Sequence, residues 1–334
     1  MKNKKKILII GGAGFIGHNL AIELIKNYDV EIIDSLMVNN LNSVIGNVDK
    51  LPNPYLSQNL LYERFELLKK QKIPLHIQDA RDYSALSHLF NKIKPEIVIH
   101  LAAVSHATRS NKDPFSTFDH SFRTLENALD NSRGRVSHFI YFSSSMVYGN
   151  FKSNIVDELS ICEPLGIYAA LKYSGEKIVK AYNQTFDLPF TIIRPSALYG
   201  QRCISRRVTQ IFIENAINNQ VITINGDGDE LLDFTYIKDL CMGIKLVIEK
   251  KESLNEIFNI TYGSAKKIIN LIDILKEFFD LKIEYKKRDK LMPKRGTLSV
   301  NKAKNLLNYD PTWNLDKGYR DYIKWYLNFK NFEK

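Results

Sequence analysis

The stretch "ILIIGGAGFIGHNLAIEL", Ile7–Leu24, decides the fold of this chain. An apolar run of strand length leads directly into Gly11, Gly14 and Gly17, and a helix-length segment follows them. In such a unit the first glycine permits a tight turn, the next lets the backbone approach a pyrophosphate, and the last lets the helix pack on the strand. The helix N-terminus adds N–H donors and the positive end of its dipole. We therefore expect a strand–turn–helix unit that holds a dinucleotide.

An acidic residue follows at the end of the next predicted strand, "VEIID", Val30–Asp34. The carboxylate of Asp34 can accept hydrogen bonds from the adenosine ribose hydroxyls and would repel a 2′-phosphate, which favours NAD over NADP. Phe15 and Ile16, within the glycine turn, are expected among the cofactor contacts. The alternative is a helix-capping aspartate beside a structural glycine turn, and the agreement of strand, turn, helix and acid disfavours it.

Strand-length apolar runs alternate with helix-length amphipathic segments through the first half of the chain. The runs are continuous, as in strands that are buried on both faces of a parallel sheet. The expected strands are Lys6–Ile10, Val30–Asp34, Pro74–Ala80, Glu96–Ala103, His138–Ser144 and Pro189–Pro195, and the expected helices include Phe115–Asn131, Ala169–Phe186 and, near the C-terminus, Asp316–Phe329. This alternation predicts an α/β fold with a Rossmann-type doubly wound parallel sheet.

The predicted division places the dinucleotide-binding domain at residues 1–195 and a smaller C-terminal α/β substrate-binding lobe at residues 196–334, folded as one body with the first. Residues 35–73 form a long connection that contains "LPNP" and a helix near Ser57–Lys70. We interpret this connection as an insertion that lies either over the active site or at a subunit contact.

Composition sets limits on the kind of protein. The 334 residues are 44% hydrophobic and 25% charged, with a net charge of +10. Much of the positive excess lies in short runs such as Lys2–Lys6, which we interpret as solvated surface rather than a nucleic-acid site. The three cysteines have neither metal-ligand nor disulfide spacing, which indicates a cytoplasmic protein with no metal. No apolar segment is long enough to cross a bilayer.

Tyr168 and Lys172 form "YAALK" at the start of a predicted helix. Their spacing of four places the phenol and the ammonium group on one helix face. A neighbouring cation lowers the pKa of a phenol toward neutral pH, which makes Tyr168 a usable acid and base. Tyrosine and lysine four residues apart occur on many helices, so the pair is informative only together with the glycine turn.

These features, followed in order by "QDARD", "HLAA", "SSSMVYG" and "RPSALYGQR", closely resemble the extended short-chain dehydrogenase/reductase family. The resemblance is strongest to its NAD-dependent sugar-nucleotide epimerases and dehydratases, in particular those similar to UDP-glucose 4-epimerase, and covers about Lys5 to Tyr326. It implies that Tyr168 takes a proton from a sugar hydroxyl, that Lys172 holds the nicotinamide ribose, and that Ser144 hydrogen-bonds the reacting oxygen. The further cofactor contacts that it implies are Asp79, Ala80, Leu101, Ala102, Ala103 and Pro195.

The segment "SSSMVYG" separates the reactions known in that family. Dehydratases that resemble this chain carry Thr-Asp-Glu where it has Ser144, Ser145 and Met146, and decarboxylases carry glutamate at the Met146 position. Expelling water requires an acid for the leaving hydroxyl and a base for the neighbouring carbon, and neither Ser145 nor Met146 supplies a carboxylate. The reaction that remains is epimerisation at C4, by transient oxidation to a keto sugar and re-reduction. Ser143 and Met146 are interpreted as packing residues.

Several substrate-side positions depart from the family pattern. His120 and Arg123 stand where an asparagine and a glycine are usual, and Ala197 and Leu232 replace a substrate-binding asparagine and a diphosphate-binding arginine. Arg295 matches the second diphosphate arginine. Arg202, Arg206 and Arg207 could replace the missing one, or could belong to a solvated helix start. The candidate substrate residues are Ser105, His106, Arg109, Ser145, Met146, Arg202, Arg207 and Arg295.

We therefore expect an NAD-dependent sugar-nucleotide epimerase with tightly held NAD, working as a homodimer through a helix pair that includes Ala169–Phe186. One alternative is a 4-dehydrogenase or reductase that releases the keto sugar and consumes added NAD. Another is a non-catalytic NAD-binding interaction protein. The sequence indicates neither the nucleotide, nor the sugar, nor the carbon that is inverted.

Overall fold

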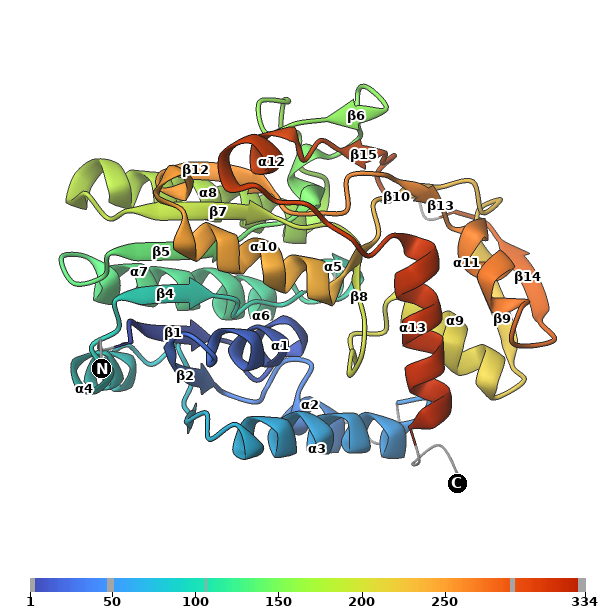
Figure 1. Ribbon diagram of the computed structural model, residues 1–334, viewed down its shortest axis with the longest axis horizontal. Helices are drawn as coiled ribbons and strands as arrows, with labels where there is room; N and C mark the ends of the chain where they lie inside the picture. Colours follow the sequence, from blue (N-terminus) through green and yellow to red (C-terminus); the bar gives the residue numbers. More distant parts are fainter. Residues whose placement is uncertain (1–3, 47–50, 106, 289–291, 330–334) are drawn as a thin grey trace.

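The computed structural model describes residues 4–46, 51–105, 107–288 and 292–329. Its centre is a seven-stranded parallel sheet in the order β12-β7-β5-β4-β1-β2-β3 (Figure 1). The strands are β1 (Lys6–Ile10), β2 (Asp29–Asp34), β3 (Leu75–Ile77), β4 (Ile97–His100), β5 (His138–Phe142), β7 (Phe190–Arg194) and β12 (Glu256–Asn259). The order reverses between β1 and β4, and this topological switch point opens a crevice at the carboxyl ends of the strands. The predicted doubly wound α/β fold is confirmed.

Helices cover both faces of the sheet because successive strand residues point to opposite sides. Ile7 and Ile9 of β1 belong to a hydrophobic core shared with the helices α1, α10 and α12. Leu8 and Ile10 belong to a second core shared with α4, α7 and α8. The bounds of these helices are Phe15–Leu24 for α1, Tyr83–Ile93 for α4, Thr124–Ser132 for α7, Gly166–Phe186 for α8, Ile237–Glu249 for α10 and Asn301–Leu307 for α12.

The second half of the chain contributes to both parts of the molecule. β12 pairs with β7, and α10 packs on the same sheet face as α1. Residues 237–260 thus return to the central sheet after the chain has visited the smaller lobe. The predicted domain boundary at residue 195 remains a prediction. Elements on both sides of that residue pack together on the central sheet.

The smaller lobe lies beside the carboxyl edge of the sheet, and its helix α13 (Leu315–Asn328) stands upright on the side nearest the sheet in Figure 1. Its core is rich in aromatic side chains, among them Tyr199, Phe212, Tyr319 and Tyr326. Its elements are β8 (Leu198–Tyr199), α9 (Val208–Ile217), β9 (Val221–Asn225), β10 (Leu231–Leu232), β11 (Thr235–Tyr236), β13 (Lys266–Lys267), α11 (Ile269–Leu275), β14 (Lys282–Lys286) and α13 (Leu315–Asn328). In the part of the chain that the structure describes, every helix is too short or too polar to span a membrane.

The insertion at residues 35–73 bridges the two parts. It contains α2 (Leu41–Ile45) and α3 (Pro54–Lys70), and α3 begins where the Asn53 side chain accepts a hydrogen bond from the Leu56 backbone N–H. Leu56 and Leu60 join the core of the smaller lobe, whereas Leu68 joins the core beneath the sheet. The helix α3 therefore packs against both the lobe and the sheet side of the molecule. This packing was not part of the prediction, which placed the insertion over the active site or at a subunit contact.

The predicted helix Phe115–Asn131 is interrupted. The chain forms α6 (Pro114–Phe118), a π-helical turn at Asp119–Arg123 and then α7. A π turn inserts an extra residue per turn, is rare, and is frequent at functional sites. Short elements complete the fold: α5 (Ala107–Lys112), a 3₁₀ turn at Ser145–Tyr148, and β6 (Ile155–Val156), which pairs with β15 (Thr297–Leu298).

Candidate active site

A groove opens at the switch point between β1 and β4. Its walls come from the glycine turn, from the ends of β2, β3 and β4, and from the lobe residues Leu198, Ser205 and Arg207. The predicted cofactor residues that line it are Gly11, Gly14, Phe15, Ile16, Gly17, Asp34, Asp79, Ala80, Leu101, Ala102 and Ala103. The predicted cofactor residues Tyr168, Lys172 and Pro195 lie outside this lining.

The glycine turn leaves no room for side chains. Gly11 has a φ of +82°, and a Cβ atom there would lie 2.7 Å from the backbone nitrogen of Ala102. A Cβ atom on Gly17 would lie 2.4 Å from the Cα atom of Gly12. At these glycines the backbone before the N-terminus of α1 is uncovered by side chains, and this allows the close approach of a pyrophosphate.

Asp34 is held in place at the end of β2. Its carboxylate accepts hydrogen bonds from the backbone N–H groups of Ala13, at 3.0 Å, and Leu36, at 2.8 Å. Burial raises the pKa of Asp34, and these hydrogen bonds, together with the nearby Arg64 guanidinium, oppose the rise. A carboxylate has about four acceptor positions, so Asp34 retains capacity for ribose hydroxyls. The bare turn and this carboxylate fit NAD.

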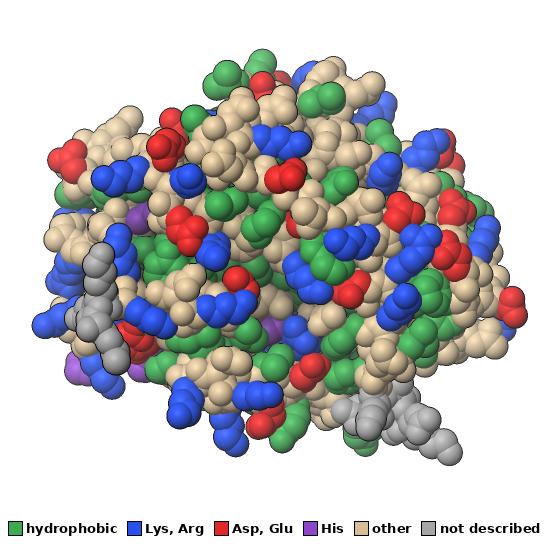
Figure 2. All heavy atoms as spheres, in the orientation of Figure 1, with side chains coloured by type: hydrophobic (Ala, Val, Ile, Leu, Met, Phe, Trp, Pro, Cys, Tyr) green, Lys and Arg blue, Asp and Glu red, His purple; other side chains and the backbone are tan. Residues whose placement is uncertain are grey.

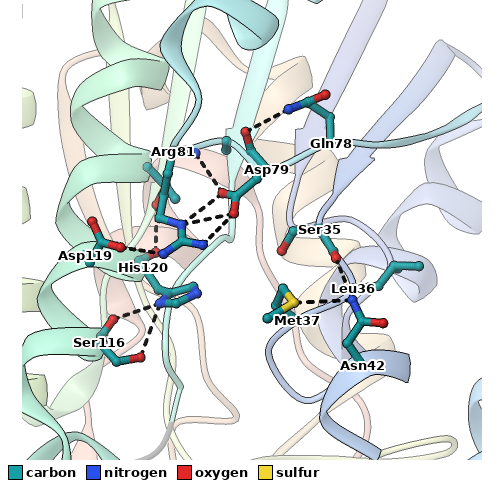
Figure 3. Close-up of polar contacts among 12 residues, drawn as sticks. Ser35, Leu36, Met37, Asn42, Gln78, Asp79, Arg81, Ser116, Asp119 and His120 are labelled. Carbon is teal, nitrogen blue, oxygen red and sulfur yellow. Dashed lines mark hydrogen bonds and ion pairs between the residues drawn. The ribbon is translucent and has the colours of Figure 1, made fainter. Parts of the chain in front are cut away.

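The end of β3 carries an ion-paired carboxylate. Asp79 accepts hydrogen bonds from Arg81, whose guanidinium also contacts Asp119 in the π turn (Figure 3). Burial alone would raise the pKa of Asp79, but the hydrogen bonds from Arg81 outweigh burial and lower it. Arg81 therefore joins the β3 end of the groove to the helix that follows β4.

The catalytic candidates gather at the end of β5, the strand beside β4. Lys172 is buried on α8, and its Nζ donates to the carbonyl oxygen of Phe142 at 2.7 Å. Burial lowers the pKa of Lys172 to about 8, and the Glu176 carboxylate partly opposes this shift. Tyr168 lies half-buried one turn earlier on α8. The Ser144 hydroxyl accepts a hydrogen bond from the Met146 backbone at 3.2 Å.

Beneath these residues lies a buried ion pair. Glu176 and Arg194 form two hydrogen bonds, of 2.9 and 2.7 Å, and both side chains are almost fully buried. The Ser143 hydroxyl donates to the same carboxylate at 2.5 Å. The Ser143 hydroxyl is thus hydrogen-bonded inside the protein, in agreement with the interpretation of Ser143 as a packing residue.

Ser145 and Met146 meet other predicted residues. The Ser145 backbone N–H donates to the carbonyl oxygen of Pro195 at 2.9 Å, which brings the two segments together. Met146 is buried, and its sulfur contacts the guanidinium of Arg295. Burial, with the cations Arg207 and Arg288 nearby, lowers the pKa of Arg295 to about 10, while Tyr168 opposes this shift.

The remaining substrate candidates separate in space. Ser105 and Arg207 both line the groove. They also contact each other, since the Arg207 guanidinium donates to the Ser105 carbonyl oxygen at 3.1 Å. Arg202 points the other way, toward His18, Asn19 and Glu63. His106 and the side chain of Arg109 lie outside the described residues.

Sequence reasoning missed several residues of the groove. These are Ser35, Val38, Asn39, Gln78, His120 and Thr124. Ser35 directly follows a predicted strand and Gln78 lies near the end of another, so the rule that ligands bind at the carboxyl ends of parallel strands could have found these two. Val38 and Asn39 lie further along the loop after Asp34. His120 was noticed only as a departure from the family pattern.

The sheet order, the glycine turn and the carboxylate at the end of β2 define a dinucleotide-binding protein of the Rossmann type. The sequence profile described as "NAD dependent epimerase/dehydratase family" matches residues 7–261. The chain belongs to this family, and its cofactor is NAD.

Relatives and solved structures agree with this membership. A putative UDP-glucose 4-epimerase of Methanocaldococcus jannaschii is 31% identical, over 96% of this chain and 98% of its own. A dTDP-D-glucose 4,6-dehydratase of Dictyostelium discoideum is 31% identical, over 84% of this chain and 62% of its own. The crystal structure of UDP-glucuronic acid 4-epimerase from Bacillus cereus, with UDP-glucuronic acid and NAD, superposes with a TM-score of 0.84, at 28% identity, over 96% of this chain and 99% of that one.

Proposed function

We propose that this protein is an NAD-dependent epimerase of nucleotide sugars that inverts C4. The observation that carries the proposal is the composition of the β5 end, where Ser144, Tyr168 and Lys172 are present and a serine and a methionine occupy the positions of the dehydratase carboxylates. Met146 is buried against Arg295, so the position offers a thioether and a cation, neither of which can act as a general base. Oxidation and reduction need no such base beyond Tyr168.

In this mechanism Tyr168 takes the proton of the sugar hydroxyl as the carbon is oxidised, and returns it on reduction. Ser144 orients the reacting oxygen through its hydroxyl. Lys172 is buried one turn further along α8, where its Nζ donates to the carbonyl oxygen of Phe142, and it would hold the nicotinamide ribose. Bound NAD supplies the hydride acceptor and donor. Inversion requires that the keto sugar turn in the pocket before reduction.

The proposed substrate is a nucleoside diphosphate sugar, as for the UDP-sugar epimerases among the relatives. Arg207 and Arg295 support this, because neither forms a salt bridge with a carboxylate of the described residues, and such guanidinium groups bind diphosphate oxygens well. Arg202 contributes to the fold rather than to this site, since its guanidinium is engaged by Glu63 and by the Nε2 atom of His18.

A homodimer through α8 is part of the proposal. Exposed apolar side chains lie on α6 and at both ends of α8: Phe115, Phe118, Ile167 and Phe186. α6 contacts α8, so these residues belong to neighbouring helices. A surface of this kind is stabilised when a second copy covers it. A cytoplasmic location, expected from the cysteines, completes the proposal.

The rivals predict different results. A 4-dehydrogenase or reductase would change the amount of NADH and release the keto sugar. A non-catalytic protein that binds RNA would use a basic surface, but Figure 2 shows lysine and arginine side chains scattered among acidic ones on this face. The two enzyme reactions share every residue named above and are separated only by their products.

The test is incubation of the purified protein with a panel of UDP- and dTDP-sugars without added NAD, followed by proton NMR and mass spectrometry. An epimerase gives a product of unchanged mass with altered ring couplings at C4. A product that has lost water would show a dehydratase, and stoichiometric NADH would show a dehydrogenase. RNA binding that falls with salt, without any sugar product, would identify the non-catalytic rival.

A further inference from the structure

A hydrogen bond joins the loops that follow β2 and β4. The side-chain amide of Asn39 donates to the hydroxyl oxygen of Ser105 at 2.9 Å. β2 and β4 are the two neighbours of β1 in the sheet (Figure 1), so a contact between the loops at their carboxyl ends crosses the end of β1. The glycine turn starts at that end, with Gly11. We call the pair formed by Asn39 and Ser105 the strap.

The strap and the glycine turn are walls of the same groove. Asn39 and Ser105 both line it, as do Gly11 and Gly14 of the turn. The pyrophosphate of a dinucleotide lies at such a turn, before the N-terminus of the helix. The strap crosses the end of the strand that leads into this turn, so the pyrophosphate of a bound dinucleotide would lie between the turn and the strap.

The loop after β2 holds Asn39 in its orientation. The Leu36 backbone N–H donates to the Asp34 carboxylate at 2.8 Å, and the Leu36 carbonyl oxygen accepts from the Asn42 backbone N–H at 2.9 Å. Asn39 has a φ of +48°, a left-handed conformation that asparagine adopts more readily than most residues. The loop is therefore ordered by its own backbone contacts, and asparagine suits both the backbone and the bond to Ser105.

Ser105 is held from two further directions. Its backbone carbonyl oxygen accepts a hydrogen bond from the Arg207 guanidinium at 3.1 Å, which attaches the smaller lobe. The backbone N–H of the preceding residue, Val104, donates to the Ser121 hydroxyl oxygen at 3.1 Å, which attaches the π turn. The hydroxyl that Asn39 reaches is thus carried by a segment that the rest of the protein holds in place.

We propose that the strap retains NAD, by closing the groove over the pyrophosphate. The bond between Asn39 and Ser105 breaks before NAD leaves, so it sets the rate of dissociation. Since the bond joins two protein side chains, and not the protein to the cofactor, its loss speeds the entry of NAD as well as its release. Retention serves the proposed epimerase, because the NADH formed by oxidation must stay for the reduction. The strap itself depends on NAD alone and not on the sugar.

The dissociation rate of NAD from the holoenzyme tests the strap. Protein loaded with radiolabelled NAD is mixed with excess unlabelled NAD, and the label that stays bound is followed by rapid gel filtration. Asn39→Gly removes the side chain and adopts the positive φ without strain. Its dissociation rate constant should rise about fivefold, because one hydrogen bond is lost. An unchanged rate constant would overturn the proposal.

The Kd of NAD distinguishes a strap from a direct contact with the cofactor. Equilibrium dialysis of the same protein against labelled NAD measures it. In Asn39→Gly the Kd should change by less than about twofold, since association and dissociation accelerate together. A rise in Kd as large as the rise in the dissociation rate constant would mean that Asn39 binds NAD itself, and that the groove is not closed by its bond to Ser105.

Two further variants test whether the pair acts as one unit. Ser105→Ala removes the hydroxyl but keeps the carbonyl oxygen that Arg207 contacts, and it should accelerate release by the same factor as Asn39→Gly. The double variant should release NAD no faster than either single variant, because all three lack the same bond. Effects that multiply in the double variant would show that the two side chains act separately, which contradicts the proposal.

Asn42→Ala is the matched control at the end of the same loop. The Asn42 side chain contacts Ser35 and Met37, which belong to that loop (Figure 3). This variant should release NAD at the wild-type rate. Release as fast as from Asn39→Gly would show that order within the loop, rather than its bond to Ser105, retains the cofactor. No sugar is present in these measurements, so their outcome is independent of the epimerase assay.

Discussion

The Nε atom of Arg64 donates a hydrogen bond to the backbone carbonyl oxygen of Arg202 at 3.0 Å. Arg64 is fully buried on the inserted helix α3, and Arg202 begins the loop of the smaller lobe that leads to Arg207. The side chain of Arg202 in turn reaches His18 on α1. These two contacts connect the insertion, the lobe and the helix that follows the phosphate turn.

Replacing Arg64 by methionine should lower the free energy of unfolding by about 2 kcal/mol, because the partly buried carbonyl oxygen of Arg202 loses its donor. Urea unfolding followed by circular dichroism measures the change. Tyr62→Ala, at an exposed position of the same helix, should change it by less than about 0.5 kcal/mol. Equal stability of Arg64→Met and wild type would show that α3 is held by its apolar contacts alone.

The buried pair of Glu176 and Arg194 predicts a second stability effect. Arg194→Met leaves the Glu176 carboxylate buried, with Ser143 as its one remaining hydrogen-bond partner among the described residues, which should cost about 3–5 kcal/mol. The double variant Arg194→Met with Glu176→Leu should recover most of the loss, since it removes both charges of the pair. Denaturant unfolding of the three proteins checks this. If the double variant is no better than the single one, the pair stabilises the fold through more than its charge balance.

Tyr168→Phe should reduce turnover by at least about a hundredfold while the protein keeps its NAD, because only the proton-transferring hydroxyl is removed. Turnover is measured by the NMR assay, and bound NAD by absorbance after the protein is denatured. Tyr173→Phe is the matched control on the same helix, and its turnover should stay near that of wild type. An active Tyr168→Phe enzyme would contradict the proposed mechanism.

The pKa of Lys172 predicts a pH dependence of stability in the cofactor-free protein. Burial lowers this pKa from 10.5 to about 8. Below about pH 8 the lysine is charged in both states, and the folded protein bears the full cost of the buried charge. Between about 8 and 10.5 the unfolded chain binds the extra proton, so the contribution of Lys172 to the free energy of unfolding rises with pH, by roughly 3 kcal/mol in all.

The difference in unfolding free energy between wild type and Lys172→Met isolates this contribution, because the variant lacks the titrating group. The difference should move in favour of wild type between pH 8 and 10.5. A difference that stays constant over that window would mean that the lysine keeps its ordinary pKa in the folded protein.

Much of the fold could be predicted because its determinants are local. The six predicted strands are all present, with ends that differ by a few residues, since continuous apolar runs report burial on both faces of a sheet. The strand β12 was missed, because a four-residue segment that follows a loop carries little periodicity. The break in the helix after Pro114 was missed as well, because a π turn leaves the amphipathic pattern nearly unchanged.

The sequence by itself determined the dinucleotide turn, the parallel sheet and the Tyr168–Lys172 pair, because each depends on spacing within one strand or one helix. Only the tertiary structure decided which arginine faces the groove: Arg207 does, while Arg202, five residues earlier, faces His18. It also decided that the Asp79 carboxylate is paired with Arg81, whose guanidinium is in turn paired with Asp119 in the π turn. These outcomes depend on which side chains from distant segments fill one another's hydrogen-bonding capacity, and local periodicity carries no record of that.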